Sequence, residues 1–150
     1  MSSASSESTG RRPPADVRVV LDTNVYVSAI LFDGLPELPL KLARMRKLSL
    51  VTSEAIIAEL VGVLKSKFGW NPRQIEDVDK ELRSLGSVVE TKSRLNVIRG
   101  DDADNRALEC AVDGQVDLIV TGDRHLAALG SFAGIRIISP KAFAEALGLG

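Results

Sequence analysis

The chain has 150 residues, enough for one ordinary domain with a single hydrophobic core. Its formal net charge is −1, so no general basic field marks a nucleic-acid-binding protein, and any polyanion must be held by local patches or bound cations. The one cysteine, Cys110, excludes an internal disulfide and favours a reducing, cytoplasmic compartment, and no apolar run is long enough to span a bilayer.

The N-terminal residues 1–15 are rich in serine and contain the run Arg-Arg-Pro-Pro. They lack the apolar stretch of a secretory signal, and they hold too few apolar residues to offset the entropy that is lost on ordering. We therefore expect a disordered tail there, followed by one folded domain over residues 16–150.

The first structured stretch, residues 17–24, is predicted to be a buried strand that ends in an acid. Its apolar centre, residues 19–21, is typical of a strand buried on both faces, and Asp22 follows at the carboxyl end. Ligands of open α/β sheets bind at that edge. Two interpretations of Asp22 are open at this point: it caps the helix predicted over residues 25–31, or it holds a positive partner such as a metal ion.

The second helix is predicted to start near Pro39, and residues 48–51 form the second predicted strand. Ser53 has the position of an N-cap for a helix that runs to about Lys67. Glu59 borders the apolar stripe of this helix instead of lying on the opposite, solvated face. A surface glutamate at the rim of the stripe is the alternative interpretation.

The next part of the chain contains a predicted helix over about residues 71–85 and a third strand over residues 87–90. Pro72 lies just inside the start of that helix, where proline is favoured. The connection over residues 91–99 matches neither pattern, so no structure is predicted for it.

A helix with an acid-dense start follows, and it is predicted to continue to about residue 114. The helix dipole is a sufficient explanation for Asp101 and Asp102 in its first turn. Asp104 differs because the apolar residues Ala107 and Leu108 share its face. We therefore expect its side chain to point toward the sheet.

The run Leu-Ile-Val-Thr-Gly-Asp from Leu118 repeats the opening motif, an apolar strand that ends in an acid, here Asp123. A short helix over about residues 125–129, a fifth strand over residues 135–138 and a last helix over residues 139–148 follow. Strands that alternate with helices predict parallel βαβ units, and hence a three-layer α/β/α sandwich.

Four acids are expected to meet at the carboxyl edge of this sheet. Asp22 and Asp123 end buried parallel strands, which are about 4.8 Å apart if adjacent. Asp104 lies in the first turn, and Glu59 in the second turn, of helices that begin at the same edge. Four carboxylates without a basic partner cannot all stay ionised in a dry pocket, whereas a hard divalent cation stabilises them. Oxygen ligands favour Mg²⁺ or Mn²⁺ over Zn²⁺, and such sites hydrolyse phosphodiesters.

These motifs together resemble the PIN-domain family, which contains Mg²⁺-dependent ribonucleases and the VapC-like toxins of toxin–antitoxin pairs. Each motif is weakly specific alone, but the four stand in the family's order and span nearly the whole chain after residue 15. The similar segments are Leu-Asp-Thr-Asn at residues 21–24, residues 53–60, Asp-Asp-Ala-Asp-Asn at residues 101–105, and Thr-Gly-Asp at residues 121–123.

The resemblance implies a parallel five-stranded sheet of strand order 3-2-1-4-5, in which Asp22 and Asp123 lie on neighbouring strands. It also implies metal binding by Asp22, Asp104 and Asp123, with Glu59 completing the acidic set. These four residues are therefore the predicted catalytic and metal-binding residues.

Two positions depart from the pattern of the family. His125 stands where many relatives have a second acid after Thr-Gly-Asp, and we favour a helix-start residue over a phosphate contact there. Asn105 is another acid in many relatives, so the auxiliary negative charge is lower here. Neither departure removes a predicted metal ligand.

The sequence thus predicts a metal-dependent endoribonuclease, with Mg²⁺ or Mn²⁺ as its cofactor, that acts on single-stranded or looped RNA. The expected role is that of the toxin of a type II toxin–antitoxin pair, with a cognate antitoxin and a second copy of the chain as possible partners. The candidate substrate contacts are Asn24, Thr121 and Arg124, together with Arg99 and Arg106 near the same edge.

Two alternatives remain open at the level of sequence. The first is a phosphatase with Asp22 as a covalent nucleophile, although such an enzyme normally carries a second acid two residues on, where this chain has Asn24. The second is a non-catalytic PIN-like scaffold or RNA-binding module, for which we expect a site that binds no metal.

Overall fold

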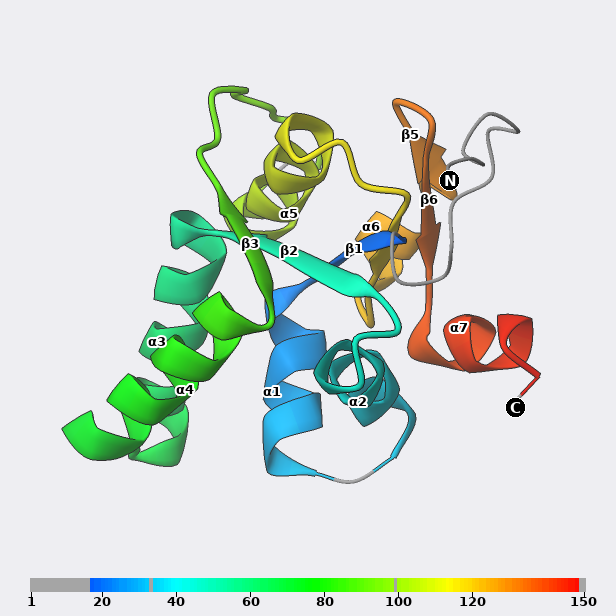
Figure 1. The fold of residues 1–150 in the computed structure, drawn as a ribbon. Coiled ribbons are helices and arrows are strands. Elements are labelled where there is room, and N and C mark those ends of the chain that lie inside the picture. The colour runs from blue at the N-terminus through cyan, green and yellow to red at the C-terminus, as the bar shows by residue number, and fades with distance from the viewer. Residues whose placement is uncertain (1–16, 33, 99, 149–150) are drawn as a thin grey trace, which may run out of the picture.

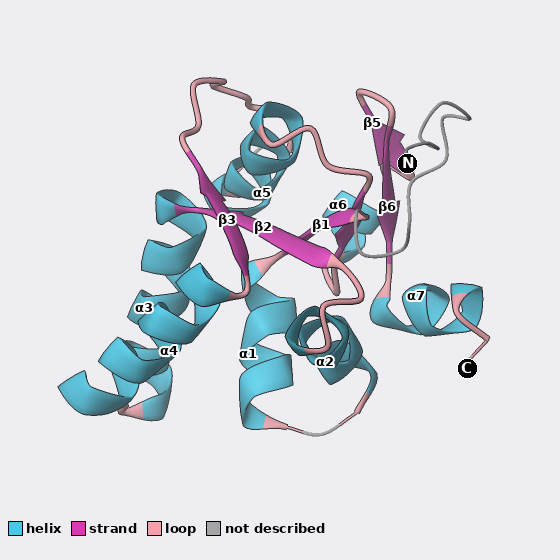
Figure 2. Ribbon diagram, viewed as in Figure 1, coloured by secondary structure: helices cyan, strands magenta, loops and turns pink. Residues whose placement is uncertain are grey.

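The computed structural model describes residues 17–32, 34–98 and 100–148. The expected tail of residues 1–15 lies outside the described residues. Figure 1 shows a central sheet with helices packed against it, and Figure 2 separates the strands from the helices in the same view. No helix in the described part of the chain combines the length and the hydropathy that a membrane crossing requires.

The sheet has six strands in the order β3-β2-β1-β4-β6-β5. All neighbouring pairs are parallel except β5 and β6, which pair antiparallel. The strands are β1 (Arg18–Leu21), β2 (Ser49–Ser53), β3 (Gly86–Val89), β4 (Leu118–Val120), β5 (Ser131–Phe132) and β6 (Ile135–Ile138).

The predicted parallel order 3-2-1-4-5 is confirmed for the five strands that the sequence indicated, and the sixth strand, β5, is the difference. β5 has two residues and pairs only with the start of β6, through Ser131 with Arg136 and Phe132 with Ile135. A segment this short has no alternating pattern that sequence analysis can detect. It extends the sheet at the edge farthest from β3 and leaves the predicted edge for the acids unchanged.

Helices cover both faces of the sheet, as the alternating pattern predicts. In Figure 1, α1 and α2 lie on one side of the strands and α5 lies on the other, and α5 packs against β1, β2 and β4. The helical segments are α1 (Thr23–Leu31), the short 3₁₀ turn η3 (Leu35–Glu37), α2 (Leu38–Arg44), α3 (Glu54–Phe68), α4 (Pro72–Ser84), α5 (Asp102–Asp113), α6 (Arg124–Ala127) and α7 (Pro140–Ala146).

Side-chain caps fix where the helices begin. Ser53 accepts a hydrogen bond from the Ile56 N–H at 3.3 Å, so the predicted N-cap of α3 is confirmed. Asn71 forms a reciprocal capping box with Gln74 at the start of α4. Because such caps satisfy the free N–H groups of a first turn, α3 starts immediately after the last residue of β2, at the carboxyl edge of the sheet.

The core is built on the three apolar residues of β1. Val19, Val20 and Leu21 are completely buried between the two helical layers, as expected for a central parallel strand. Cys110 on α5 is also completely buried and packs in this core. Both faces of β1 are covered by helices. Asp22, the residue directly after β1, is therefore the first residue beyond the buried strand that lines a cavity.

The connection before α5, for which the sequence predicted no structure, runs alongside α5. Its backbone N–H groups are bound by side chains of that helix: Asp113 accepts from Lys92 and Ser93, and Glu109 accepts from Leu95. Within the described part of the chain, the segment forms no backbone hydrogen bonds to a neighbouring strand, and these side chains instead provide acceptors for its N–H groups.

Candidate metal centre

A cavity of about 160 Å³ opens at the carboxyl edge of the sheet, beside the ends of β1 and β4. All four predicted acids, from four separate parts of the sequence, contribute to its wall. The residues that line it are Asp22, Thr23, Asn24, Glu59, Asp101, Ala103, Asp104 and Asp123.

Asp22 both caps α1 and faces the cavity, so the two interpretations of this residue are compatible. One carboxylate oxygen, Oδ1, accepts a hydrogen bond from the Val25 N–H at 2.9 Å, and the other accepts from the Thr121 hydroxyl. The residue is 4% exposed. Burial raises the pKa of Asp22 and the nearby Asp123 charge raises it further, although the hydrogen bonds from Thr121 and Val25 act in the opposite direction.

Asp123 follows β4, which pairs with β1, so it lies beside Asp22 as predicted for neighbouring parallel strands. Its Oδ1 accepts from the N–H groups of His125 at 2.8 Å and Leu126 at 3.0 Å, at the start of α6. Burial raises the pKa of Asp123, but the N–H of Leu126, the Asp104 side chain and the N–H of His125 outweigh it and hold the pKa below its ordinary value. Asp123 is therefore more favoured to be ionised than Asp22 or Asp104.

Thr121 connects these two acids. Its hydroxyl donates to Asp22 and accepts from the Asp123 N–H at 2.9 Å, and the residue is 1% exposed. Both hydrogen-bonding directions of the hydroxyl are thus used inside the protein. The geometry gives Thr121 a positioning role between the acids, and its contact with a substrate stays a prediction.

Asp104 projects inward from the first turn of α5, as its apolar neighbours predict, and it is 4% exposed. Its Oδ2 is buried without a hydrogen-bond donor among the described residues. Burial first, then contact with Asp123 and the charges of Asp101 and Asp22, raise the pKa of Asp104 to about 8. A buried carboxylate oxygen that lacks a donor and faces other acids is an unfavourable arrangement unless a cation or a proton occupies the space between them.

Asp101 is the member of this cluster that sequence reasoning missed. Its side chain caps α5 by accepting from the Asp104 N–H at 3.0 Å, which agrees with the helix-dipole explanation. The same residue also lines the cavity, and one carboxylate oxygen each from Asp101, Asp104 and Asp123 lie within 4.8 Å of one another. The sequence does show three acids within residues 101–104. Nothing in the local sequence, however, distinguishes an aspartate that caps a helix from one that binds a metal ion.

Glu59 reaches the cavity from the second turn of α3, and the residue itself is exposed. Glu59 therefore lies at the rim of the cavity. It is a surface glutamate and also lies beside the other acids, so each of the two interpretations from the sequence is partly correct. Asn24 is likewise exposed and lines the cavity beside Asp22. The helix cap next to it is Asp22, which leaves the Asn24 amide available to a ligand.

The predicted arginine contacts are less well placed. Arg106 donates to Glu109 at 2.8 Å and to the Leu95 carbonyl at 3.3 Å, so its guanidinium is engaged within the protein. Arg124 is exposed and is not part of the cavity wall, and Arg99 lies outside the described residues. His125 is exposed as well, with its Nδ1 3.9 Å from Asp123.

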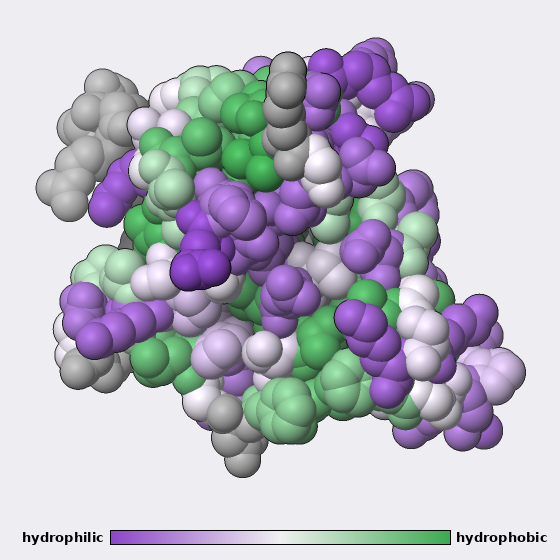
Figure 3. All heavy atoms as spheres, turned by 180° about the vertical axis from the view of Figure 1, so that it is seen from behind, coloured by the Kyte–Doolittle hydropathy of each residue, from purple (hydrophilic) through white to green (hydrophobic). Residues whose placement is uncertain are grey.

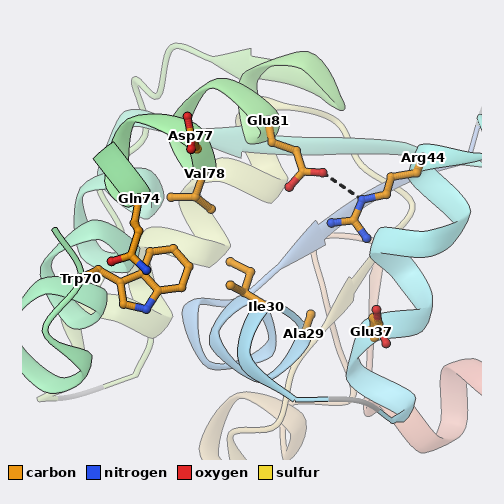
Figure 4. A pocket seen from close by; sticks show the side chains of 9 residues that line it. All are labelled: Ala29, Ile30, Glu37, Arg44, Trp70, Gln74, Asp77, Val78 and Glu81. Carbon is orange, nitrogen blue, oxygen red and sulfur yellow. Dashed lines mark hydrogen bonds and ion pairs between the residues drawn. The ribbon is translucent and has the colours of Figure 1, made fainter. Parts of the chain in front are cut away.

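A larger groove of about 360 Å³ lies elsewhere, between α1, η3, α2 and α4 (Figure 4). Trp70 forms one wall, with Ile30 facing it, and three carboxylates lie around it. The cation of its described lining, Arg44, is paired with Glu81 at 2.9 Å. This groove has neither converging acids with unsatisfied oxygens nor an available cation for a phosphate, so the smaller acidic cavity is the better candidate for chemistry.

The acidic cavity fits a hard divalent cation. Its donors are carboxylate oxygens at mutual distances that one ion can span, and the orphaned Oδ2 of Asp104 is buried among them. Oxygen-only donor sets favour Mg²⁺ or Mn²⁺, and no comparable group with histidine or cysteine occurs in the described part of the chain. Asp101, Asp104 and Asp123 are the closest set, and Asp22 lies next to them in the wall.

Comparison with known proteins gives a concordant result. A family model described as PIN domain matches residues 18–125, which include all four predicted acids. The crystal structure of PAE2754 from Pyrobaculum aerophilum is similar over 91% of this chain and 92% of that chain, with a TM-score of 0.55 and 20% sequence identity. At this identity the likeness shows the fold alone. No protein in a curated collection matches the chain significantly.

Proposed function

Because the chain belongs to the PIN-domain family, whose members are generally metal-dependent nucleases, we propose that it is a metal-dependent endoribonuclease that hydrolyses phosphodiester bonds of RNA. The observation that carries the proposal is the convergence of Asp101, Asp104 and Asp123 around the unsatisfied Oδ2 of Asp104. Such an arrangement is unfavourable for stability alone, and clusters of this kind are characteristic of functional sites.

In this proposal, Asp101, Asp104 and Asp123 hold the divalent cation, Mg²⁺ or Mn²⁺, with Asp22 beside them. A cation bound there supplies positive charge that neutralises phosphate oxygens and lowers the pKa of a water molecule. It also gives the acidic cavity itself an affinity for an anionic backbone.

The protein's own groups orient the acids and the substrate. Thr121 keeps the Asp22 carboxylate turned toward Asp123 through its two hydrogen bonds. The first turn of α6 holds Asp123 ionised. Glu59 and Asn24, exposed at the rim, are placed to contact the attacking water or the RNA, with the Glu59 carboxylate as an acceptor for a proton of the water.

We further propose that the biological role is that of the toxin of a toxin–antitoxin pair. PIN-domain nucleases act on RNA and often pair with antitoxins, which supports this role. A cognate antitoxin is expected to inhibit by covering the acidic cavity, with a cationic side chain in place of the metal ion. Co-purification with a protein encoded nearby, and loss of RNA cleavage in that complex, test this part of the proposal.

Cleavage of single-stranded RNA by the purified chain tests the proposed activity. We expect cleavage with Mg²⁺ or Mn²⁺, its loss on addition of EDTA, and a loss of at least a hundredfold in Asp104→Asn. Asp102→Asn is the matched control, because it removes the same charge from the same turn of α5 at an exposed position outside the cavity wall. Equal activity of the Asp104 variant and the wild type contradicts the proposal.

A further inference from the structure

Residues 91–98 are here called the α5-bound segment, and over residues 91–96 alternate side chains face the solvent. Thr91, Ser93 and Leu95 are partly buried, and the residues between and after them, Lys92, Arg94 and Asn96, are exposed. This period of two is that of an extended chain, in which successive side chains point to opposite sides. The outward row therefore consists of two cations and an amide.

The segment is hydrogen-bonded to three side chains of α5 that are spaced four residues apart, Asn105, Glu109 and Asp113. Asp113 accepts from the N–H groups of Lys92 at 2.6 Å and Ser93 at 2.8 Å. Glu109 accepts from Leu95 at 2.8 Å. Residues four apart lie on one face of a helix, so the segment lies along that face of α5.

Asn105 closes the end of the segment that meets the acidic cavity. Its Oδ1 accepts from the N–H groups of Val97 and Ile98 at 2.9 and 3.0 Å. Its Nδ2 donates to the Ile98 carbonyl at 2.7 Å and to the Asp101 carbonyl at 2.9 Å. One buried amide thus joins the segment to Asp101 in the cavity wall, and Asn105 itself follows Asp104 directly.

The helix provides a scale for the distance between the outward row and the cavity. At a rise of 1.5 Å per residue, Glu109 lies about 6 Å and Asp113 about 12 Å beyond Asn105 along the helix axis. Arg94 and Lys92 are therefore spaced along the last 6 Å of this path. A stacked nucleic-acid strand advances about 3.4 Å per nucleotide, so the path corresponds to about three to four nucleotides.

The two outward cations differ in their surroundings: the charge of Lys92 acts on Asp113, whereas no acid in the described part of the chain pairs with Arg94. Glu109 is occupied by the Leu95 N–H and by Arg106, and Asp113 by the backbone of the segment and the Ser93 hydroxyl. Within the described residues, the Arg94 guanidinium has no hydrogen bond or ion pair. Among the described residues Arg94 is thus an unpaired cation on a hydrogen-bonded segment that leads along α5 to the candidate metal centre.

We propose that the outward row of the α5-bound segment, Lys92, Arg94 and Asn96, binds the phosphate backbone of the RNA strand that enters the acidic cavity. The proposal rests on the proposed ribonuclease function and adds the path of the substrate. A cavity walled by acids cannot attract an RNA strand along its length by itself, so cations beside it are needed to position the strand. Figure 3, seen from behind, shows hydrophilic side chains gathered at the upper right, where this segment lies.

RNA binding in EDTA tests this proposal without cleavage. A labelled single-stranded RNA of twelve nucleotides is titrated with the full chain, and its anisotropy is measured at several salt concentrations. We expect Arg94→Glu to weaken binding about tenfold, and Arg94→Ala to reduce the slope of log K against log salt by about 0.7, the value for one lost contact to a single-stranded phosphate. Arg73→Glu, the same charge change at an exposed position of α4, should leave binding unchanged. Unchanged thermal unfolding of both variants checks that the fold is intact.

The results distinguish failure of the proposed RNA-binding row from failure of the proposed ribonuclease activity. If the wild type cleaves RNA and Arg94→Glu binds it as tightly as the wild type, the path is wrong and the proposed function stands. If cleavage is absent but Arg94→Glu still weakens RNA binding while Arg73→Glu does not, the path stands and the nuclease fails. Absence of RNA binding by the wild type overturns the path. Competition by polyglutamate as effective as by RNA of equal charge overturns the assignment to RNA, because it assigns the row to an acidic polypeptide.

Discussion

Replacement of Asp104 by asparagine should make the metal-free protein more stable and abolish its stabilisation by Mn²⁺. The side chain is 4% exposed, its Oδ2 has no donor among the described residues, and its pKa is raised to about 8 by burial and by the neighbouring acids. Asparagine has nearly the same size, carries no charge and can donate to the Asp123 carboxylate. It therefore removes the repulsion and keeps the packing.

The sign of the pH dependence follows from the direction of the pKa shift. The folded-state pKa of Asp104, about 8, lies above the ordinary value of 3.8, so the folded protein holds this proton more tightly than the unfolded chain. The contribution to stability is fully present below pH 3.8 and is lost as the pH rises through about 8. The metal-free wild type should thus lose stability between these pH values, whereas Asp104→Asn should lose less.

The size of the change in stability follows from the difference between the two pKa values of Asp104. Holding the Asp104 proton in the folded protein at pH 7, where the unfolded chain has lost it, costs at most roughly 4 kcal/mol. Because the cavity opens to water, which screens the charges, we expect Asp104→Asn to raise the free energy of unfolding by only about 1–2 kcal/mol, or roughly 3–8 °C in Tm.

Thermal unfolding of the wild type, Asp104→Asn and the control Asp102→Asn in EDTA at pH 5 and pH 8 measures this effect. The difference between Asp104→Asn and the wild type should be larger at pH 8 than at pH 5, and Asp102→Asn should be close to the wild type. Addition of Mn²⁺ should raise the Tm of the wild type and of Asp102→Asn only. An Asp104 variant that is less stable than the wild type at pH 8, or that keeps the Mn²⁺ response, would refute the reasoning.

Three further predictions concern the hydrogen bonds around the site and the packing of the sheet. Thr121→Val should destabilise the fold by about 1–3 kcal/mol in denaturant unfolding and weaken Mn²⁺ binding, because it leaves the Oδ2 atom of Asp22 without its hydroxyl donor. Rescue by Thr121→Ser confirms that the hydroxyl is responsible. Asn105→Ala should cost about 2–4 kcal/mol and speed hydrogen exchange at residues 97 and 98, whose amides it binds; unchanged exchange there contradicts the described clamp. Gly86→Ala should destabilise by more than about 2 kcal/mol, since an added Cβ would overlap a carbonyl oxygen of β2, whereas Gly62→Ala, with open space on α3, should stabilise by up to about 1 kcal/mol.

The strand order and the meeting point of the acids could be predicted because both follow from local signals. β1 and β4 are continuous apolar runs that each end before an acid, and parallel βαβ connections bring such ends to one edge. The periodic pattern of α5 gave the inward direction of Asp104. The roles of these acids in metal binding and catalysis stay predictions.

The features that were missed depend on partners distant in the sequence or on single atoms. The α5-bound segment has no ladder partner, and its hydrogen bonds go to α5 side chains up to 21 residues away, which no local pattern encodes. Asp101 matches an ordinary N-cap, so its second role at the cavity becomes visible only when Asp123 is brought beside it. Asn105 was interpreted as a lost charge, whereas burial and four hydrogen bonds make it a clamp.

Carboxylates from separate parts of the chain are proposed to hold a divalent cation at the carboxyl edge of the sheet. A crystal structure of the protein grown with Mn²⁺ tests this arrangement through the anomalous scattering of the metal. We predict an anomalous peak in the cavity, within about 2.0–2.4 Å of oxygens from Asp101, Asp104 or Asp123. A cavity without such a peak at saturating Mn²⁺, or a peak bound only at other residues, would contradict the proposed arrangement.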